Sequence, residues 1–190
     1  MRQLLLVSGN RHKEQEMSKI LGEYGIKLRR RALPIQEPDL ESLERVAEEK
    51  AKQAFALVKR PLIVEDTGVY FDAYKSFPGL FAKRMYLSLG FPGLLKLLEG
   101  RKRTGHFKVA VTYIWEKSKF KTFTGKLPGT FTTRVHDRNR NVLPYEKIFI
   151  PLGKKKTLSS VSREEKNTFS HRAIATEKFG KWFKKNNSSG

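Results

Sequence analysis

Cysteine is absent from the 190 residues of the sequence. Without thiols the chain cannot form disulfides, thiolate zinc sites or a cysteine nucleophile, and this composition fits an intracellular protein. Long apolar runs are absent too, since Leu4–Val7 is far shorter than a signal-peptide core and no segment approaches the ~20 apolar residues of a membrane span. The sequence therefore predicts a cytoplasmic protein without a membrane segment.

Acidic residues are scarce relative to basic ones, with 19 Asp and Glu against 39 Lys and Arg and a formal charge of +20. Such an excess predicts an anionic partner, but charge alone does not separate nucleic acid from nucleotides. The length suits one sizeable core, or two small lobes around a cleft. We predict a single domain over residues 1–185, followed by a frayed polar end at 186–190.

The hydrophobic pattern alternates between strand and helix periods, which predicts an α/β fold. The apolar run 62–64 predicts a short buried strand, and the glycines and prolines after it predict a loop-rich region. The other expected elements are a strand at 3–7, a helix ending near Gly25, a strand at 26–30, an acidic loop at 34–39, a helix ending before Lys59-Arg60-Pro61, a short helix at 94–98, a hairpin over 106–123 and a C-terminal helix.

The first candidate site is the turn Ser8-Gly9-Asn10, which follows the first strand and has Lys13 behind it. Amides at a helix N-terminus can hold phosphate oxygens, and Lys13 would add charge. The alternative is an ordinary strand-to-helix turn with a solvated lysine. Its place directly after the first strand favours ligand binding, because open α/β sheets bind ligands there.

The second candidate site is Glu65-Asp66-Thr67-Gly68, at the predicted end of a buried strand. The two carboxylates could hold a hard metal ion, and one could orient or deprotonate a water. A capped turn, with Asp66 accepting backbone donors near Gly68, is the alternative. Two adjacent acids in a chain so rich in cations favour the metal.

The third candidate site is Lys166 with Ser170-His171-Arg172, predicted as one helical entry. These side chains supply a point charge, a switchable donor and a bidentate fork that suit phosphate or a base edge. Ser170 is also a plausible N-cap of the last helix, and both roles are compatible.

The order of these motifs, with Phe77-Pro78-Gly79 between them, resembles the inosine triphosphate pyrophosphatase family of noncanonical purine nucleotide hydrolases. The resemblance runs from Leu4 to about Phe179. It implies Mg²⁺-dependent cleavage of ITP, dITP or XTP to the monophosphate and pyrophosphate. It also implies a mixed central sheet, an elongated two-lobed fold with a central cleft, and a homodimer.

Roles carried over from the resemblance place the triphosphate on the Ser8–Lys13 loop and the metal on Asp66, which would also act as base toward water. The other substrate and metal contacts that it implies are Gly9, Asn10, Lys50, Glu65, Thr67, Lys166, His171 and Arg172. Ser8 stands where the family usually has Thr, and the hydroxyl is retained.

Two segments depart from the family pattern. Leu143-Pro144-Tyr145-Glu146 stands where the family usually has aromatic-Gly-aromatic-Asp. Tyr145 can still stack on a purine, while Pro144 removes an amide donor and Glu146 carries its carboxylate one methylene farther than Asp would. In the acidic loop, Glu37 is the carboxylate that we expect on the metal side.

Two other functions fit the sequence. A basic nucleic-acid-binding protein is suggested by the charge and by Phe107, Tyr113 and Trp115, which could stack bases, although alternating aromatics on a strand more often face a core. Nonspecific binding of nucleic acid follows from the charge in any case. A nucleotide-binding relative that has lost hydrolysis is suggested by Pro144 and Glu146.

Overall fold

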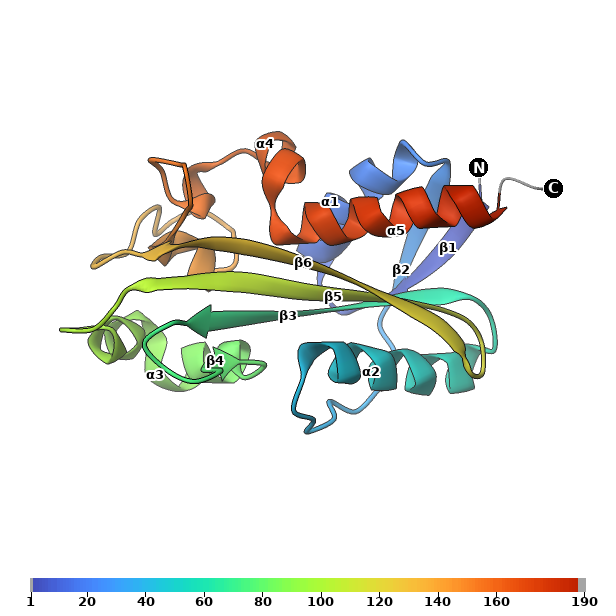
Figure 1. Ribbon diagram of the computed structural model, residues 1–190, viewed down its shortest axis with the longest axis horizontal. Coiled ribbons are helices and arrows are strands. Elements are labelled where there is room, and N and C mark those ends of the chain that lie inside the picture. The colour runs from blue at the N-terminus through green and yellow to red at the C-terminus, as the bar shows by residue number, and fades with distance from the viewer. Residues whose placement is uncertain (1, 188–190) are drawn as a thin grey trace. The chain divides into compact units, whose positions relative to one another are not determined.

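The computed structural model describes residues 2–187, and the chain divides into two compact units. The first unit comprises Met1–Asp66, Val109–Gly125 and Ser170–Gly190, and the second comprises Thr67–Lys108 and Lys126–Phe169. Figure 1 traces the elements in order. They are β1 Arg2–Val7, α1 Arg11–Gly22, β2 Ile26–Arg31, α2 Leu43–Val58, β3 Leu62–Phe71, β4 Pro78–Gly79, α3 Ala82–Leu97, β5 Thr104–Glu116, β6 Lys119–Phe131, η1 Pro144–Ile148, β7 Phe149–Pro151, η2 Leu158–Ser160, α4 Arg163–Phe169 and α5 His171–Asn187.

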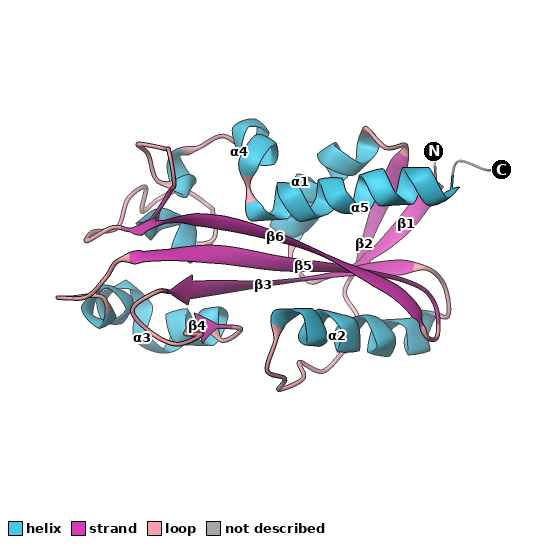
Figure 2. Cartoon of the chain, viewed as in Figure 1, coloured by secondary structure: helices cyan, strands magenta, loops and turns pink. Residues whose placement is uncertain are grey.

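The strands form one mixed sheet of seven strands in the order β2-β1-β3-β5-β6-β7, with β4 paired to β3. Strand β1 is parallel to β2 and β3, whereas β4 and β7 are antiparallel to their partners. Only two residues separate β5 from β6, so this pair is a hairpin. The predicted α/β fold with a mixed central sheet is confirmed (Figure 2).

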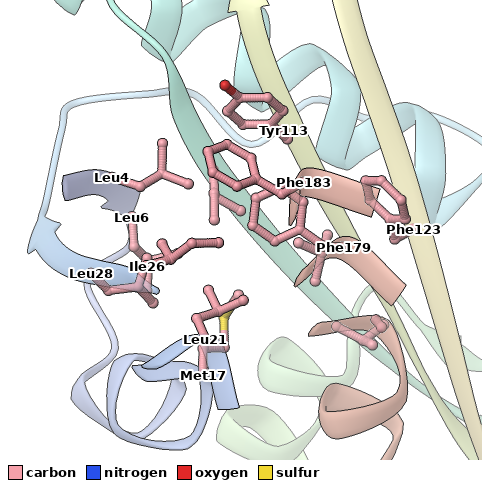
Figure 3. Close-up of a cluster of buried hydrophobic side chains, with 14 residues drawn as sticks. Leu4, Leu6, Met17, Leu21, Ile26, Leu28, Tyr113, Phe123, Phe179 and Phe183 are labelled. Carbon is pink, nitrogen blue, oxygen red and sulfur yellow. The ribbon is translucent and has the colours of Figure 1, made fainter. Parts of the chain in front are cut away.

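Strand β1 is buried on both faces and organises the core of the first unit. Leu4 and Leu6 pack on the face covered by α1 and α5, and the alternating residues Leu5 and Val7 pack on the face covered by α2. Residues of a strand alternate between faces, so a strand covered on both sides is apolar throughout. Figure 3 shows the side chains that meet Leu4 and Leu6, among them Met17, Leu21, Phe179 and Phe183.

The core of the second unit combines aliphatic side chains with a group of aromatic rings. Phe71 contacts Phe131 edge-on with 4.6 Å between ring centroids, and Phe107 contacts Phe149 in the same way at 4.8 Å. Edge-to-face contacts of this kind contribute about 0.5–1.5 kcal/mol each beyond the area they bury. The rings therefore tie β3, β5, β6 and β7 together within this unit.

The aromatic residues considered for base stacking belong to these cores. Phe107 and Tyr113 are buried, and Trp115 packs against the cluster of Figure 3. None of the three presents a fully exposed ring, so the structure does not favour a base-stacking surface on β5. Over residues 2–187, no helix is long and apolar enough to cross a membrane.

Several predicted boundaries were wrong. Strand β3 does not end at Val64 but continues to Phe71, because Val69 and Phe71 resume the buried pattern. The region predicted as loops contains α3, whose 16 residues are kinked at Gly90. Lys166 and Arg172 lie on separate helices, α4 and α5.

The polar end predicted to fray begins inside a helix. Asn186 and Asn187 belong to α5, and their side-chain amides donate to the carbonyls of Trp182 and Phe183. The rest of that predicted segment, 188–190, lies outside the described residues.

Gly125 of β6 allows the start of α5 to approach the sheet within the first unit. A Cβ at this position would lie 2.0 Å from the carbonyl oxygen of His171, well inside van der Waals contact. Because the obstructing atom is backbone, Gly125→Ala is expected to lower the free energy of unfolding by about 1–3 kcal/mol, the range of overpacked cores. Urea denaturation would measure this change.

The matched control is Gly22→Ala at the end of α1, where an added Cβ meets nothing within 4 Å. Alanine favours helix by up to about 1 kcal/mol over glycine, so this variant should be as stable as the parent or more stable. Equal stability of the two variants would show that α5 can shift away from β6 without cost.

Candidate active site

The loop after β1 joins the strand to α1 through an Asn N-cap. The Asn10 Oδ1 atom accepts from the His12 amide at 2.9 Å, and the Asn10 amide donates to the Ser8 hydroxyl at 3.1 Å. Asn10 has an extended backbone, as an N-cap requires. Gly9 between them is exposed. The strand, turn and helix predicted here are therefore present, and capping and anion binding remain compatible.

Lys50 of α2 lies between two carboxylates. Its Nζ is 3.0 Å from Glu37 Oε1 in the acidic loop and 3.4 Å from Asp66 Oδ2 in β3. Burial lowers the pKa of Lys50, but the carboxylates of Asp66 and Glu37 outweigh it and raise that pKa above its ordinary value. The ammonium is therefore charged throughout the physiological range.

The two carboxylates beside Lys50 are partly exposed to solvent. The side chain of Asp66 is 16% exposed and that of Glu37 is 65% exposed. No group of three His, Asp or Glu able to hold a metal occurs within residues 2–187. Mg²⁺ is usually held by one or two carboxylates together with substrate phosphates and waters, so this pair fits a metal that shares its ligands with a nucleotide.

Glu65, the neighbour of Asp66, belongs to a different cluster because adjacent strand residues face opposite sides of a sheet. Glu65 Oε2 is 2.5 Å from Lys13 Nζ of α1, and Glu65 Oε1 is 3.2 Å from Arg172 Nε of α5. Arg172 also pairs with Glu16 of α1 through Nη1. The structure thus brings Asp66, Lys50 and Glu37 together on the α2 face, and Glu65, Lys13 and Arg172 on the α1 and α5 face.

Burial limits what the second cluster can do. The side chain of Glu65 is fully buried and that of Arg172 is 1% exposed, whereas Lys13 is partly exposed. Buried charges persist when they are paired and hydrogen-bonded, as these are. The geometry favours a structural role for Glu65 and Arg172 over direct contact with metal or substrate. Lys13 remains able to reach a ligand.

Glu16 was not assigned a role from the sequence, although its position on an apolar helical face could have identified it. It lies three residues after Lys13, next to Met17 on the buried face of α1. A charged residue inside an apolar helical face needs a buried partner, and here that partner is Arg172.

Three of the predicted residues form two contacts within the second unit. Lys166 Nζ of α4 is 3.0 Å from Glu146 Oε2 of η1, and both side chains are buried. Tyr145 is buried beside Phe71, and its hydroxyl donates to the Ala82 carbonyl at 2.9 Å. Burial raises the pKa of Tyr145, which stays protonated. The predicted stacking of Tyr145 on a purine is not favoured by this packing.

The remaining predicted residues have simpler environments. Thr67 is half-buried in β3, and His171 is buried as the first residue of α5. Ser170 caps that helix, since its hydroxyl accepts from the Ala173 amide at 3.1 Å. The N-cap predicted for Ser170 is confirmed.

Comparisons with known proteins support the family that the order of the motifs suggested. The Ham1 family pattern matches residues 4–182. A protein named dITP/XTP pyrophosphatase from Thermococcus kodakarensis is 34% identical over 184 residues, covering 96% of this chain and 98% of the relative. One of the same name from Methanopyrus kandleri is 35% identical over 184 residues, covering 96% and 97%.

A solved structure gives the same result for the fold. A HAM1 protein from Coxiella burnetii superposes with a TM-score of 0.83 at 23% identity, covering 97% of this chain and 100% of that one. The predicted resemblance is confirmed, and the chain belongs to the Ham1 family.

Proposed function

We propose that this protein is a pyrophosphatase that hydrolyses noncanonical purine nucleoside triphosphates, such as dITP, XTP and ITP, to the monophosphate and pyrophosphate. The observation that carries the proposal is Lys50 between the partly exposed carboxylates of Asp66 and Glu37, in a chain whose relatives are named dITP/XTP pyrophosphatases. Such an enzyme would act on the nucleotide pool of the cytoplasm.

The proposed chemistry is hydrolysis without a protein nucleophile. Water attacks the α-phosphorus, the bond from that phosphorus to the oxygen that bridges to the β-phosphate breaks, and pyrophosphate leaves. Bound Mg²⁺ would neutralise charge on the triphosphate oxygens, with Asp66 and Glu37 as its protein ligands. Lys50 supplies a permanent positive charge 3.4 Å from Asp66, and Lys13 supplies a second on the other face of β3. Asp66 accepts the proton of the attacking water. Positioning and electrostatics of this kind account for most catalysis of phosphoryl transfer.

Other residues would bind the phosphates and the base. The loop Ser8-Gly9-Asn10 would hold triphosphate oxygens through its amides and hydroxyl. Within the second unit, the Lys166–Glu146 pair is proposed to contact the base, because its buried charges suit a polar purine edge. Thr67 of the second unit and His171 of the first unit are proposed separately as substrate contacts.

The test is pyrophosphate release from ITP, XTP, dITP, ATP and GTP at alkaline pH, with Mg²⁺ and then with a chelator. Release from the noncanonical nucleotides in preference to ATP and GTP, lost on chelation, is the expected result. A folded protein that binds ITP but releases no pyrophosphate would instead be a nucleotide binder without hydrolysis.

We also propose that the protein is a homodimer. The support is a set of apolar side chains exposed at α3 in the second unit, namely Phe81, Leu87 and Leu89, of which Leu87 is 70% exposed. Contiguous exposed apolar patches often mark an interface, and we propose that these side chains contribute to one. Sedimentation of the protein and of Leu87→Glu would test this, because a shared interface predicts monomers only for the variant.

A further inference from the structure

Arg30 of β2 makes two contacts that converge on the start of α1. Its Nε donates to Glu14 Oε2 at 3.0 Å, and its Nη1 donates to the carbonyl oxygen of Ser8 at 3.1 Å. Arg30 is one of three consecutive arginines, but Arg29 and Arg31 are exposed, whereas the side chain of Arg30 is 21% exposed. The contacts are therefore specific to one of three neighbouring charges.

The second strand fixes both backbone polar groups of Ser8. The Ser8 amide donates to the Arg31 carbonyl at 3.1 Å, which extends the pairing of β1 with β2 by one residue. The Ser8 carbonyl accepts from Arg30. With its amide and its carbonyl both bound, the peptide plane between Ser8 and Gly9 has one preferred orientation.

That orientation determines where the Gly9 amide points. Among residues 2–187 the only cis peptide bond is Phe77–Pro78, so the Ser8–Gly9 peptide is trans. In a planar trans peptide the carbonyl and the N–H point in opposite directions. The Ser8 carbonyl is directed at Arg30, so the Gly9 N–H is directed away from it.

The space around Gly9 suits an incoming anion. Gly9 is exposed, and a Cβ built on it would meet nothing within 4 Å. On either side of it the Ser8 hydroxyl and the Asn10 side chain are already occupied by the amides of Asn10 and His12. The Gly9 amide is thus the donor of this loop whose direction depends on Arg30.

We propose that Arg30 is a positioning residue that holds the Ser8–Gly9 peptide so that the Gly9 amide donates to a phosphate oxygen of the substrate. This inference rests on the proposed function, because it takes the Ser8–Asn10 loop as the triphosphate-binding element. A fixed donor needs no reorganisation when the anion arrives, which is what makes oriented amides effective anion ligands. Arg30 itself does not contact the substrate.

The test compares Arg30→Met with Arg31→Met. Both remove one positive charge from adjacent positions of β2, but only the first removes the contacts with the Ser8 carbonyl and with Glu14. Binding of inorganic tripolyphosphate, measured by calorimetry, should weaken about tenfold in Arg30→Met and less than about twofold in Arg31→Met, since one charge-assisted hydrogen bond to an anion is lost. With nucleotide, KM should rise about tenfold while kcat changes little, because the contact acts in ground and transition states alike.

The second measurement is the change in the ¹⁵N chemical shift of the Gly9 amide when tripolyphosphate is added. If Arg30 only stabilised the fold, its substitution would not abolish this change. Tripolyphosphate should shift this resonance in the parent and in Arg31→Met but not in Arg30→Met. Arg30→Lys keeps a cation and a hydrogen-bond donor, so its affinity for tripolyphosphate should lie between those of the parent and Arg30→Met. This variant also provides the test if Arg30→Met does not fold.

Some outcomes overturn this inference, and others separate it from the proposed function. Equally weakened tripolyphosphate binding in Arg30→Met and Arg31→Met would mean that only net charge matters. Unchanged binding in both variants would mean that the orientation of the Ser8–Gly9 peptide does not contribute to anion binding. If the parent protein bound tripolyphosphate but hydrolysed no nucleotide, the proposed function would fail while the role of Arg30 stood. If the parent bound neither tripolyphosphate nor nucleotide, both would fail.

Discussion

Asp66→Asn is expected to lower the turnover of dITP or XTP by about 10³-fold, within the range for loss of a general base. The substitution keeps the shape of the side chain but removes the charge that faces Lys50 at 3.4 Å and the proton acceptor for water. Because Glu37 still pairs with Lys50 at 3.0 Å in this variant, the free energy of unfolding should change by only about 1 kcal/mol. Steady-state pyrophosphate release and urea denaturation would measure the two quantities.

Two comparison variants sharpen this prediction. Glu49→Gln removes an exposed charge from α2, beside Lys50, and should change neither quantity. Glu65→Gln alters the adjacent carboxylate of β3, which faces the opposite side of the sheet, and should act mainly on stability. Turnover of Asp66→Asn near that of the parent, or equal turnover losses in Asp66→Asn and Glu49→Gln, would remove Asp66 from the mechanism.

Arg172→Met is expected to lower the free energy of unfolding by about 3–5 kcal/mol, the cost of removing one partner from a buried ion pair. Arg172 is 1% exposed and pairs with both Glu16 and Glu65, so its loss leaves two buried carboxylates with one fewer cation. Domains of this size have about 5–15 kcal/mol of stability in total, so the variant should melt far below the parent. Thermal and urea denaturation, followed by circular dichroism, would measure the change.

The matched control is on the same helix. Lys181→Met breaks the exposed pair with Glu177, whose charged atoms are 3.6 Å apart, and should cost less than about 1 kcal/mol. Adding Glu16→Gln to Arg172→Met should recover part of the loss, because it removes one of the two uncompensated charges. An Arg172→Met protein within about 1 kcal/mol of the parent would contradict the buried network.

Local sequence patterns correctly predicted several strands, turns and helices of the first unit. The apolar run of β1, the Ser8-Gly9-Asn10 turn and the apolar stripe of α2 are each readable from adjacent residues, because the periods of strand and helix are local properties. The same reasoning missed the continuation of β3 beyond Val64. Polar Glu65 and Asp66 interrupt the apolar run, and they are tolerated inside a strand because cations of α1, α2 and α5 neutralise them.

Long-range partners could not be predicted in the same way. The candidate residues Lys50, Asp66 and Glu37 could be named, but the alternation that sends Glu65 to the other face requires knowing that β3 continues through both residues. Alternation along β2 places Arg30 on the face of Ile26 and Leu28 and so separates it from Arg29 and Arg31. Its partners, Glu14 and the Ser8 carbonyl, depend on the packing of β2 beside α1 and could not be predicted. Likewise, Glu146 and Lys166 were candidates for separate roles until the fold placed them at 3.0 Å.

The two units are interleaved along the chain, which passes from one to the other after Asp66, Lys108, Gly125 and Phe169. During synthesis, Glu16 and Glu65 leave the ribosome 156 and 107 residues ahead of Arg172, the cation that neutralises both. The nascent first unit therefore carries these two carboxylates with Lys13 but without Arg172, and its native core must wait for α5. We expect this protein to complete its folding only after translation of that last helix, so ribosome-bound chains that stop at Phe169 should remain sensitive to protease throughout the first unit.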